Sequence, residues 1–327
     1  MTRILVLDQS THGIPAEVYV DALRARLPDV SLDHPKTTDE ALELAADATI
    51  ITGVHLPDDV LAAADNVRLF AGAAAGYDHL PLETLRERGI ALTNASGVHG
   101  PNIAEHVLGW MLMITRRLDE GMRRQARHEW RHFQAMGELK DSTVTVVGLG
   151  AIGQAITERL EPFGVTTIGA RYSPEKGGPD SIDEVVGFDD LESILPRTDY
   201  LVLACPLTDT TRKLIDEDAF GALPPKAVLV NVARGGVVDT DALVTALQKG
   251  KIHAAALDVT DPEPLPNDHL LWDFENVYLT PHVSGYTPHY WTRVADILTE
   301  NVGRLASGEE LRNQVLPQAP DSSQTDS

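Results

Sequence analysis

The chain has 327 residues, 43% of them hydrophobic, which is enough for two domains that each bury a core. Its 49 acidic and 27 basic side chains give a formal net charge of −22, which disfavours nucleic acid or an anionic membrane as a partner. No apolar run approaches the roughly 18 residues needed to span a bilayer, and the first residues lack the long apolar region of a signal peptide.

A single cysteine excludes an internal disulfide framework and fits a reducing cytoplasm, where we expect the protein to work. The acidic residues are scattered over predicted helix faces and do not form an acidic tail. Such a surface repels itself at low salt but is screened at molar salt, where the Debye length is about 3 Å. The composition therefore favours a salt-rich cytoplasm, as in an extreme halophile; an ordinary acidic protein is the alternative.

The first hundred residues alternate short apolar strands with helical patterns. Strands are predicted at 4–7, 50–52, 67–70 and 91–93, and helices at 16–27 and 82–88. A helix from 102 to about 117 follows, and then an arginine-rich stretch to residue 133. The alternation predicts a parallel sheet covered by helices.

A second alternating series begins at residue 143. Strands are predicted at 143–147, 166–169, 200–204, 228–232, 254–259 and 277–279, and helices at 151–160, 189–195, 241–249 and from 287 to about 305. The fold class is thus α/β, with two doubly wound parallel-sheet domains, the second inserted into the first. The predicted domains are 1–98 plus 287–315 and 99–286, with a disordered tail at 316–327. A ligand is expected in the cleft between the domains.

The clearest motif is GLGAIG, which lies between the predicted strand 143–147 and the predicted helix 151–160. Gly148 permits the tight turn, Gly150 lets the backbone approach a pyrophosphate, and Gly153 lets helix and strand pack closely. The N–H groups at the helix start, from Ala151 and Ile152, favour a phosphate. This order of strand, glycines and helix predicts a dinucleotide-binding loop, with an isolated glycine turn as the alternative.

The end of the next strand indicates which dinucleotide binds. An Asp or Glu about 20 residues downstream would accept bonds from the ribose of NAD, but this chain has Arg171 there, followed by Tyr172 and Ser173. An arginine suits the 2′-phosphate of NADP. We therefore expect NADP to be preferred and NAD to be possible; a surface arginine with no such role is the alternative.

Three further segments follow predicted strands of the second sheet and each supplies one chemically active side chain. These side chains are Arg234, Glu263 and His282. Because the carboxyl ends of parallel strands meet at one edge, we expect the three to converge there. An arginine there can bind a carboxylate and polarise a ketone, and a histidine can exchange a proton with that ketone's oxygen. Glu263, paired with His282, would orient the ring and favour its charged form.

The whole series of motifs resembles the D-isomer-specific 2-hydroxyacid dehydrogenases, a family that includes glyoxylate, hydroxypyruvate, phosphoglycerate and D-lactate enzymes. The segments that carry the resemblance are AAAGYDHL, NASGVHGPNIAEHVLGWML, GLGAIG, CPLTDTTRKLI, NVARGG, DPEPLP and TPH. The resemblance implies a Rossmann domain inserted into a flavodoxin-like substrate domain, a homodimer, and D stereochemistry. It also implies that the protein reduces a 2-ketoacid to a D-2-hydroxyacid with His282 as the general acid and base, without a catalytic metal.

The resemblance implies further contacts as well. The loop at Ala75 and Gly76 matches the family's substrate-binding loop, and Asp258 matches its contact to the nicotinamide carboxamide. Further cofactor contacts are implied at Pro206, Thr211, Val232, Ala233, His282 and Gly285. Leu56, Tyr77 and Trp291 are interpreted as core residues in preference to pocket walls.

Two other features have less weight. The string from His128 to His132 matches the zinc-protease pattern HExxH, but four arginines surround it and no third ligand is clear. Cys205 is better interpreted as a packing residue than as a nucleophile.

The alternative function is that of a non-catalytic protein of the same fold that senses dinucleotides. The complete set of Arg234, Glu263 and His282 favours an enzyme.

Overall fold

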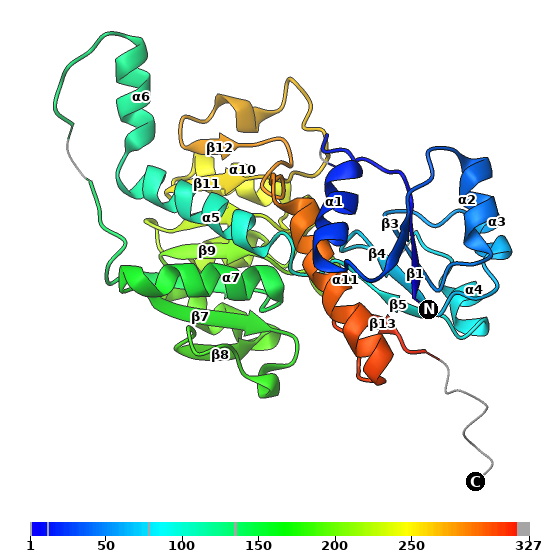
Figure 1. Ribbon diagram of the computed structural model, residues 1–327. Helices are drawn as coiled ribbons and strands as arrows, with labels where there is room; N and C mark the ends of the chain where they lie inside the picture. Colours follow the sequence, from blue (N-terminus) through cyan, green and yellow to red (C-terminus); the bar gives the residue numbers. More distant parts are fainter. Residues whose placement is uncertain (1, 12, 78, 134–135, 319–327) are drawn as a thin grey trace. The chain divides into compact units, whose positions relative to one another are not determined.

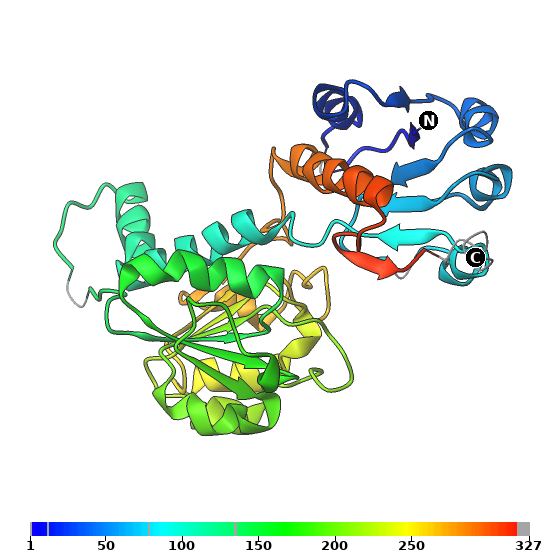
Figure 2. The same ribbon diagram turned by 60° about the horizontal axis from the view of Figure 1, so that its bottom comes forward.

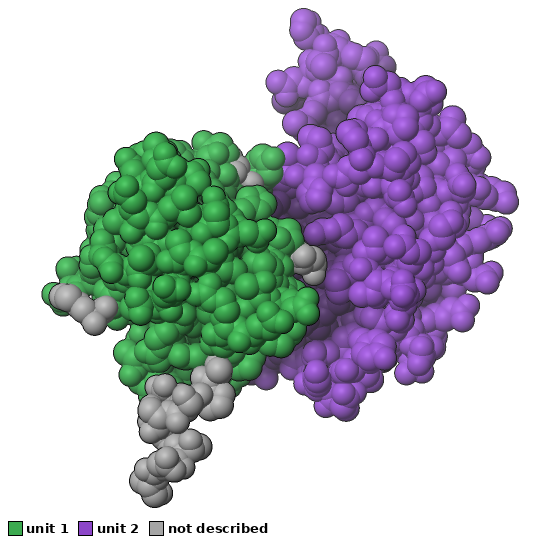
Figure 3. All heavy atoms as spheres, turned by 90° about the vertical axis from the view of Figure 1, so that its right-hand side faces the viewer, with its two compact units in different colours: residues 1–98, 286–327 green, residues 99–285 purple. Residues whose placement is uncertain are grey.

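The computed structural model describes residues 2–11, 13–77, 79–133 and 136–318. The chain divides into two compact units, residues 1–98 with 286–327 and residues 99–285, which Figure 3 colours separately. The sequence-based boundaries lay after residue 98 and after residue 286; in the structure Tyr286 belongs to unit 1. Within the described ranges, no helix is long and apolar enough to cross a membrane.

Unit 1 is built on a six-stranded sheet in the order β13-β5-β4-β3-β1-β2. Its strands are β1 (Arg3–Val6), β2 (Ser31–Asp33), β3 (Ile50–Gly53), β4 (Leu69–Gly72), β5 (Ala91–Thr93) and β13 (Gln314–Leu316). Its helices are α1 (Glu17–Arg26), α2 (Thr38–Ala45), α3 (Asp58–Ala63), α4 (Leu82–Glu87) and α11 (Tyr290–Ser307). All neighbouring strands are parallel except β13, which runs antiparallel to β5.

Helices cover both faces of this sheet (Figure 2). Alternate strand residues such as Ile4 and Ile50 pack under α1 and α11, whereas Leu5 and Ile51 pack under α2, α3 and α4. Side chains of successive strand residues point to opposite faces, so a strand buried on both faces has a continuous apolar sequence. Trp291 is 1% exposed and stacks on Tyr19, so it belongs to this core, as the sequence predicts.

Unit 2 contains a seven-stranded parallel sheet in the order β12-β11-β10-β9-β6-β7-β8. Its strands are β6 (Thr143–Val147), β7 (Thr166–Arg171), β8 (Glu184–Gly187), β9 (Tyr200–Leu203), β10 (Val228–Asn231), β11 (Ala254–Leu257) and β12 (Val277–Leu279). Its helices are α5 (Gly100–Thr115), α6 (Leu118–Ala126), α7 (Ala151–Leu160), α8 (Leu191–Ile194), α9 (Glu217–Ala222) and α10 (Thr240–Gln248). The chain reverses its direction of winding at β6 and β9, the point where ligands bind in such sheets.

Two apolar cores lie on the two faces of this second sheet. Val144 and Val146 of β6 pack with α5 and α7, and Val147 packs on the opposite side with residues of α8, α9 and α10. Both units therefore have the doubly wound α/β architecture that the sequence predicts.

The terminal tail was predicted to begin at residue 316, and this prediction is wrong at its start. Leu316 ends strand β13, is 8% exposed and pairs with Leu92 of β5. A three-residue strand whose partner lies far away along the chain leaves no periodic signal, so pattern analysis does not detect it. Residues 319–327 of the predicted tail lie outside the described part of the chain.

Helix α6 and the segment after it project away from the sheet of unit 2 (Figure 1). No residue of α6 is buried, and exposed apolar side chains lie along this projection. They are Leu118, Met122, Trp130 and Met136, with Trp130 99% exposed.

Candidate active site

The GLGAIG loop connects β6 to α7 in the geometry that the sequence predicts. Gly148 has a φ of +99°, and a Cβ there would lie 2.6 Å from the backbone nitrogen of Cys205. At Gly153 a Cβ would lie 2.0 Å from the carbonyl oxygen of Gly148, so only glycine allows α7 to pack this closely. Gly150, in contrast, has no atom within 4 Å of its Cβ position. Open space therefore adjoins the start of α7, where the N–H groups of the first turn lack helical partners.

Arg171 lies at the end of β7, beside this loop. The amide of Gly148 donates to the carbonyl of Ala170 at 2.8 Å, which holds the loop against the end of the strand. The Arg171 guanidinium donates to the carbonyl of Gly177 at 2.6 Å and is partly exposed. Tyr172 is 78% exposed, and Ser173 is half-buried next to it. An arginine and a hydroxyl thus lie where a dinucleotide's ribose is expected.

Arg234 follows β10 in a tightly packed turn. The side chain of Asn231 accepts from the amide of Ala233 at 3.0 Å and donates to the carbonyl of Arg234 at 3.1 Å. Gly235 packs so closely on the loop after β11 that a Cβ would lie 2.0 Å from the carbonyl oxygen of Thr260. The Arg234 side chain is exposed and donates one hydrogen bond, to the carbonyl of Ala233. Its remaining N–H donors are available to a ligand.

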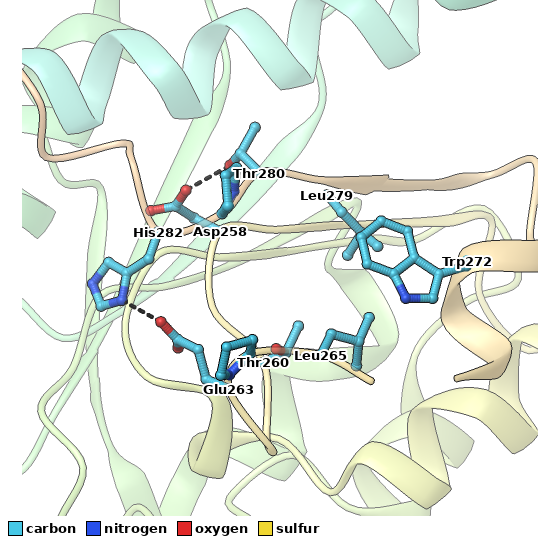
Figure 4. A pocket seen from close by; sticks show the side chains of 10 residues that line it. Asp258, Thr260, Glu263, Leu265, Trp272, Leu279, Thr280 and His282 are labelled. Atoms are coloured by element: carbon cyan, nitrogen blue, oxygen red, sulfur yellow. Dashed lines mark hydrogen bonds and ion pairs between the residues drawn. The ribbon is translucent and has the colours of Figure 1, made fainter. Parts of the chain in front are cut away.

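Glu263 and His282 form an ion pair at the same edge of the sheet. The Nδ1 atom of His282 lies 2.7 Å from Oε1 of Glu263, and both side chains are about half exposed (Figure 4). They follow β11 and β12, neighbouring strands of the parallel sheet. Because the carboxylate occupies Nδ1, the Nε2 atom on the opposite side of the ring is left for another partner.

A pocket of about 480 Å³ adjoins this pair. Asp258, Glu263 and His282 line one end, and the apolar side chains of Leu265, Trp272 and Leu279 lie at the other end (Figure 4). Arg234 is not among the lining residues. The structure therefore joins Glu263 with His282 directly, and places Arg234 in the adjacent loop.

Asp258 lies directly after β11 and is 2% exposed. Its carboxylate accepts four hydrogen bonds, from the hydroxyls of Thr280 and Ser284 and from the amides of Val283 and Ser284. Burial raises the pKa of this carboxyl, but the four hydrogen bonds outweigh burial and hold the pKa below its ordinary value. Hydrogen-bond donors of the protein itself therefore bind both oxygens of this carboxylate. The family resemblance implies that the same residue contacts the cofactor.

The remaining predicted cofactor residues line the loops after β9, β10 and β12. The hydroxyl of Thr211 donates to the carbonyl of Pro206 at 2.6 Å, which closes the loop after β9. Val232 and Ala233 are buried, so their backbone groups are the ones that a cofactor could contact. The carbonyl of Gly285 accepts from Nδ1 of His99 at 2.9 Å.

In unit 1, Ala75 and Gly76 form an exposed loop after β4. The side chain of Asn94 donates to the carbonyl of Ala75 at 2.7 Å and anchors the loop. Leu56 is 7% exposed within the core of this unit, and Tyr77 packs against that core, so neither is an open pocket wall.

The two lesser motifs do not form sites in the structure. Helix α6 ends at Ala126, so the string from His128 to His132 is not helical and does not present its histidines on one helix face. Cys205 is 3% exposed, and burial raises the pKa of its thiol to about 11, so it is a packing residue.

Residues 108–284 match the sequence model of the D-isomer specific 2-hydroxyacid dehydrogenase, NAD binding domain. The chain is 34% identical over 288 residues to a glyoxylate reductase of Thermofilum pendens, covering 85% of this chain and 84% of that protein. It is 33% identical over 330 residues to a D-3-phosphoglycerate dehydrogenase of Methanocaldococcus jannaschii, but spans only 60% of that longer relative.

A solved structure has the same fold over almost the whole chain. It is an NADPH-dependent glyoxylate/hydroxypyruvate reductase of Sinorhizobium meliloti, with a TM-score of 0.69, 29% identity, and coverage of 96% of this chain and 98% of that one. This chain belongs to the D-isomer specific 2-hydroxyacid dehydrogenase family. Its unit 2 is the NAD-binding Rossmann domain of that family, so the predicted family and the predicted dinucleotide fold are confirmed.

Sequence analysis overlooked the residues that hold the active-site turns. Asn231 braces the turn that carries Arg234, and Thr280 and Ser284 brace the turn that carries His282. A polar residue directly at the end of a buried strand was the available signal, because such a residue caps the backbone groups that the sheet leaves unpaired.

Proposed function

We propose that the protein reduces a small 2-ketoacid to the corresponding 2-hydroxyacid, with NADPH as the preferred reductant. The observation that carries the proposal is the pair of Glu263 and His282, 2.7 Å apart, at the sheet edge that also bears Arg234. Similarity to a glyoxylate reductase and to an NADPH-dependent glyoxylate/hydroxypyruvate reductase supports it. The family's D stereochemistry is part of the proposal.

Arg234 binds the substrate in this proposal. Its guanidinium is exposed, permanently charged and planar, so it pairs with the carboxylate of a 2-ketoacid through two parallel hydrogen bonds or bridges that carboxylate and the ketone oxygen. Contact with the ketone oxygen stabilises the negative charge that develops there during reduction. Ala75 and Gly76 are exposed residues and stay predicted substrate contacts, through backbone N–H groups.

His282 is the proton donor. When bound, the reduced nicotinamide supplies a hydride to the ketone carbon, and the electron pair of the carbonyl double bond moves to the oxygen. The Nε2–H bond of the His282 imidazolium breaks as that oxygen takes the proton, which leaves a neutral imidazole that solvent reprotonates. Glu263 holds Nδ1, so it orients the ring with Nε2 free to face the ketone oxygen.

The residues of unit 2 fit an NAD(P) dinucleotide. Open space at Gly150 adjoins the start of α7, so backbone amides of Ala151, Ile152 and Gly153 are the proposed pyrophosphate ligands. Arg171, with Tyr172 and Ser173, is the proposed site for the 2′-phosphate of NADP. Pro206, Thr211, Val232, Ala233 and Gly285 are proposed to contact the rest of the cofactor.

The experiment is a panel of 2-ketoacids, including glyoxylate, hydroxypyruvate and pyruvate, assayed for oxidation of NADPH and NADH at low and high KCl. We expect turnover with at least one of them and a higher kcat/KM with NADPH. Dinucleotide binding without any turnover would contradict the proposal and favour a dinucleotide-sensing protein of the same fold.

We also propose that two copies of the chain form a dimer through α6 and the segment after it. The side chains of Trp130 and of Met122 on α6 are 99% and 67% exposed, which is unfavourable in water unless a partner covers them. Light scattering after size exclusion should give twice the chain mass, and Trp130→Ser should raise the monomer fraction. A monomeric wild-type protein at micromolar concentration would contradict this proposal.

A further inference from the structure

Tyr290 is the first residue of helix α11 and is 2% exposed, within the core of unit 1. Helices α11 and α1 cover the same face of the unit 1 sheet (Figure 2). The hydroxyl of Tyr290 donates to the backbone carbonyl of Ala73, the first residue after β4. Ala73 is 0% exposed, so this carbonyl has no access to water, and a buried carbonyl without a donor would be costly. Tyr290 therefore holds the loop at the point where it leaves the sheet.

The next two carbonyls of this loop are also bound within unit 1. The carbonyl of Ala74 accepts from the amide of Ala95 at 2.9 Å. The carbonyl of Ala75 accepts from the side chain of Asn94 at 2.7 Å. Three successive carbonyls of the loop thus have a donor from another part of the unit, and only the first of these donors comes from a helix.

These bonds fix the direction of the amides that follow. In a trans peptide the N–H group points away from the carbonyl of the same peptide unit, so the three bound carbonyls turn the amides of Ala74, Ala75 and Gly76 away from their partners. Among the described residues, none accepts a hydrogen bond from these three amides. Successive N–H groups without an acceptor suit an anion such as the carboxylate of a 2-ketoacid.

We propose that Tyr290 is a positioning residue for the substrate, because its hydroxyl holds the loop after β4 so that the loop amides bind the substrate carboxylate. This inference rests on the proposed reductase function, in which Ala75 and Gly76 contact the substrate. Tyr290 is buried and acts through the loop. Its hydroxyl should therefore govern how tightly the 2-ketoacid binds, and should have little effect on proton transfer by His282 or on NADPH binding.

Tyr290→Phe is the main test, because it removes only the hydroxyl and leaves the ring in the core. The carbonyl of Ala73 then lacks its donor, so the loop amides should lose their alignment. We expect KM for the 2-ketoacid to rise about 5- to 50-fold, with kcat and the dissociation constant for NADPH within about threefold of wild type. A normal KM in this variant, or a fall in kcat alone, would overturn the proposal.

Tyr19→Phe is the matched control, since it removes another buried hydroxyl from the same aromatic cluster. The ring of Tyr19 stacks on that of Trp291, with centroids 5.0 Å apart, and its hydroxyl lies 2.9 Å from Oγ1 of Thr52 in β3. That hydrogen bond does not involve the loop after β4, so KM should stay near wild type. An equal rise of KM in both variants would indicate a general loss of core stability and would overturn the role of Tyr290.

Hydrogen exchange of the Ala95 amide tests the positioning without any turnover. This amide donates to the carbonyl of Ala74, so its exchange rate reports how often the loop opens. We expect it to exchange at least about tenfold faster in Tyr290→Phe than in wild type, and at the wild-type rate in Tyr19→Phe. Unchanged exchange in Tyr290→Phe would overturn the positioning role. A wild-type protein that turns over no 2-ketoacid would refute the proposed function, while faster exchange in Tyr290→Phe would still support Tyr290 as the residue that holds the loop.

Discussion

The residues of the site differ in how well their roles and contacts can be predicted from the sequence. Arg234, Glu263 and His282 are predictable because each follows an apolar strand, and parallel strands bring such positions to one edge. The pairing of Glu263 with His282 was predicted, but its geometry and the left-handed turn at His282 could not be, since both depend on how β11 and β12 pair. Asp258 was identified through the family resemblance, but its four intramolecular donors are visible only in three dimensions.

Replacement of His282 by Asn removes the proton donor while keeping a side chain of similar size. We expect kcat for 2-ketoacid reduction to fall about 10²- to 10⁴-fold, the usual contribution of a general acid, with little change in NADPH affinity. Steady-state assays and a fluorescence titration measure the two quantities. Turnover close to that of wild type would remove His282 from the proposed mechanism.

Arg171→Asp reverses the charge at the end of β7. Loss of charge-assisted hydrogen bonds to a 2′-phosphate should lower the ratio of kcat/KM for NADPH to that for NADH by about 10- to 100-fold. Lys176→Asp is the matched control, because it makes the same charge change at an exposed position in the segment that follows Ser173. An equal shift in both variants would indicate a general charge effect and contradict the assignment of Arg171.

Among the secondary-structure elements, those with a clear apolar period over their whole length were predicted most accurately. The predicted bounds of the strand Thr143–Val147 and the helix Ala151–Leu160 agree with the structure, because apolar residues recur there with a clear period. The prediction missed four helices of six to nine residues, α2, α3, α6 and α9, and the short strands β2, β8 and β13. Elements this short complete fewer than three helical turns or only a few strand positions, so tertiary contacts, not local pattern, decide them.

The β6–α7 loop allows structure and cofactor binding to be tested separately with two glycine variants. Gly153→Ala puts a Cβ 2.0 Å from the carbonyl of Gly148, so we expect the protein to lose about 1–3 kcal/mol of stability. Gly150→Ala meets no atom within 4 Å, so its thermal midpoint should stay near wild type while NADPH affinity falls at least about tenfold. Calorimetry and titration measure these quantities. Normal NADPH binding by Gly150→Ala would contradict the placement of a pyrophosphate at the start of α7.

For the whole molecule, the net charge of −22 is the property most open to test. We propose that this surface is adapted to a salt-rich environment, because screening of its repulsion needs a Debye length near 3 Å, as at about 1 M salt. From dilute buffer to molar KCl we expect a gain of at least about 1 kcal/mol in stability, seen as a rise in Tm of about 2–4 °C.

The control for this salt effect is a double variant with Asp65→Asn and Glu87→Gln, which removes two exposed acidic side chains. Its Tm should rise less with KCl than that of wild type, since there is less repulsion to screen. Equal or greater stability of the wild-type protein in dilute buffer would show that the acidic surface is no adaptation to salt.

The most direct test of the central claim follows a labelled hydride. The protein is incubated with glyoxylate, hydroxypyruvate and pyruvate in turn and with NADPH that carries deuterium in both positions at C4, and the products are analysed by mass spectrometry. We predict a 2-hydroxyacid with one deuterium at C2, formed at a rate that His282→Asn strongly reduces. NADPH binding without any deuterated 2-hydroxyacid from this panel, or equal product formation by the variant, would contradict the account.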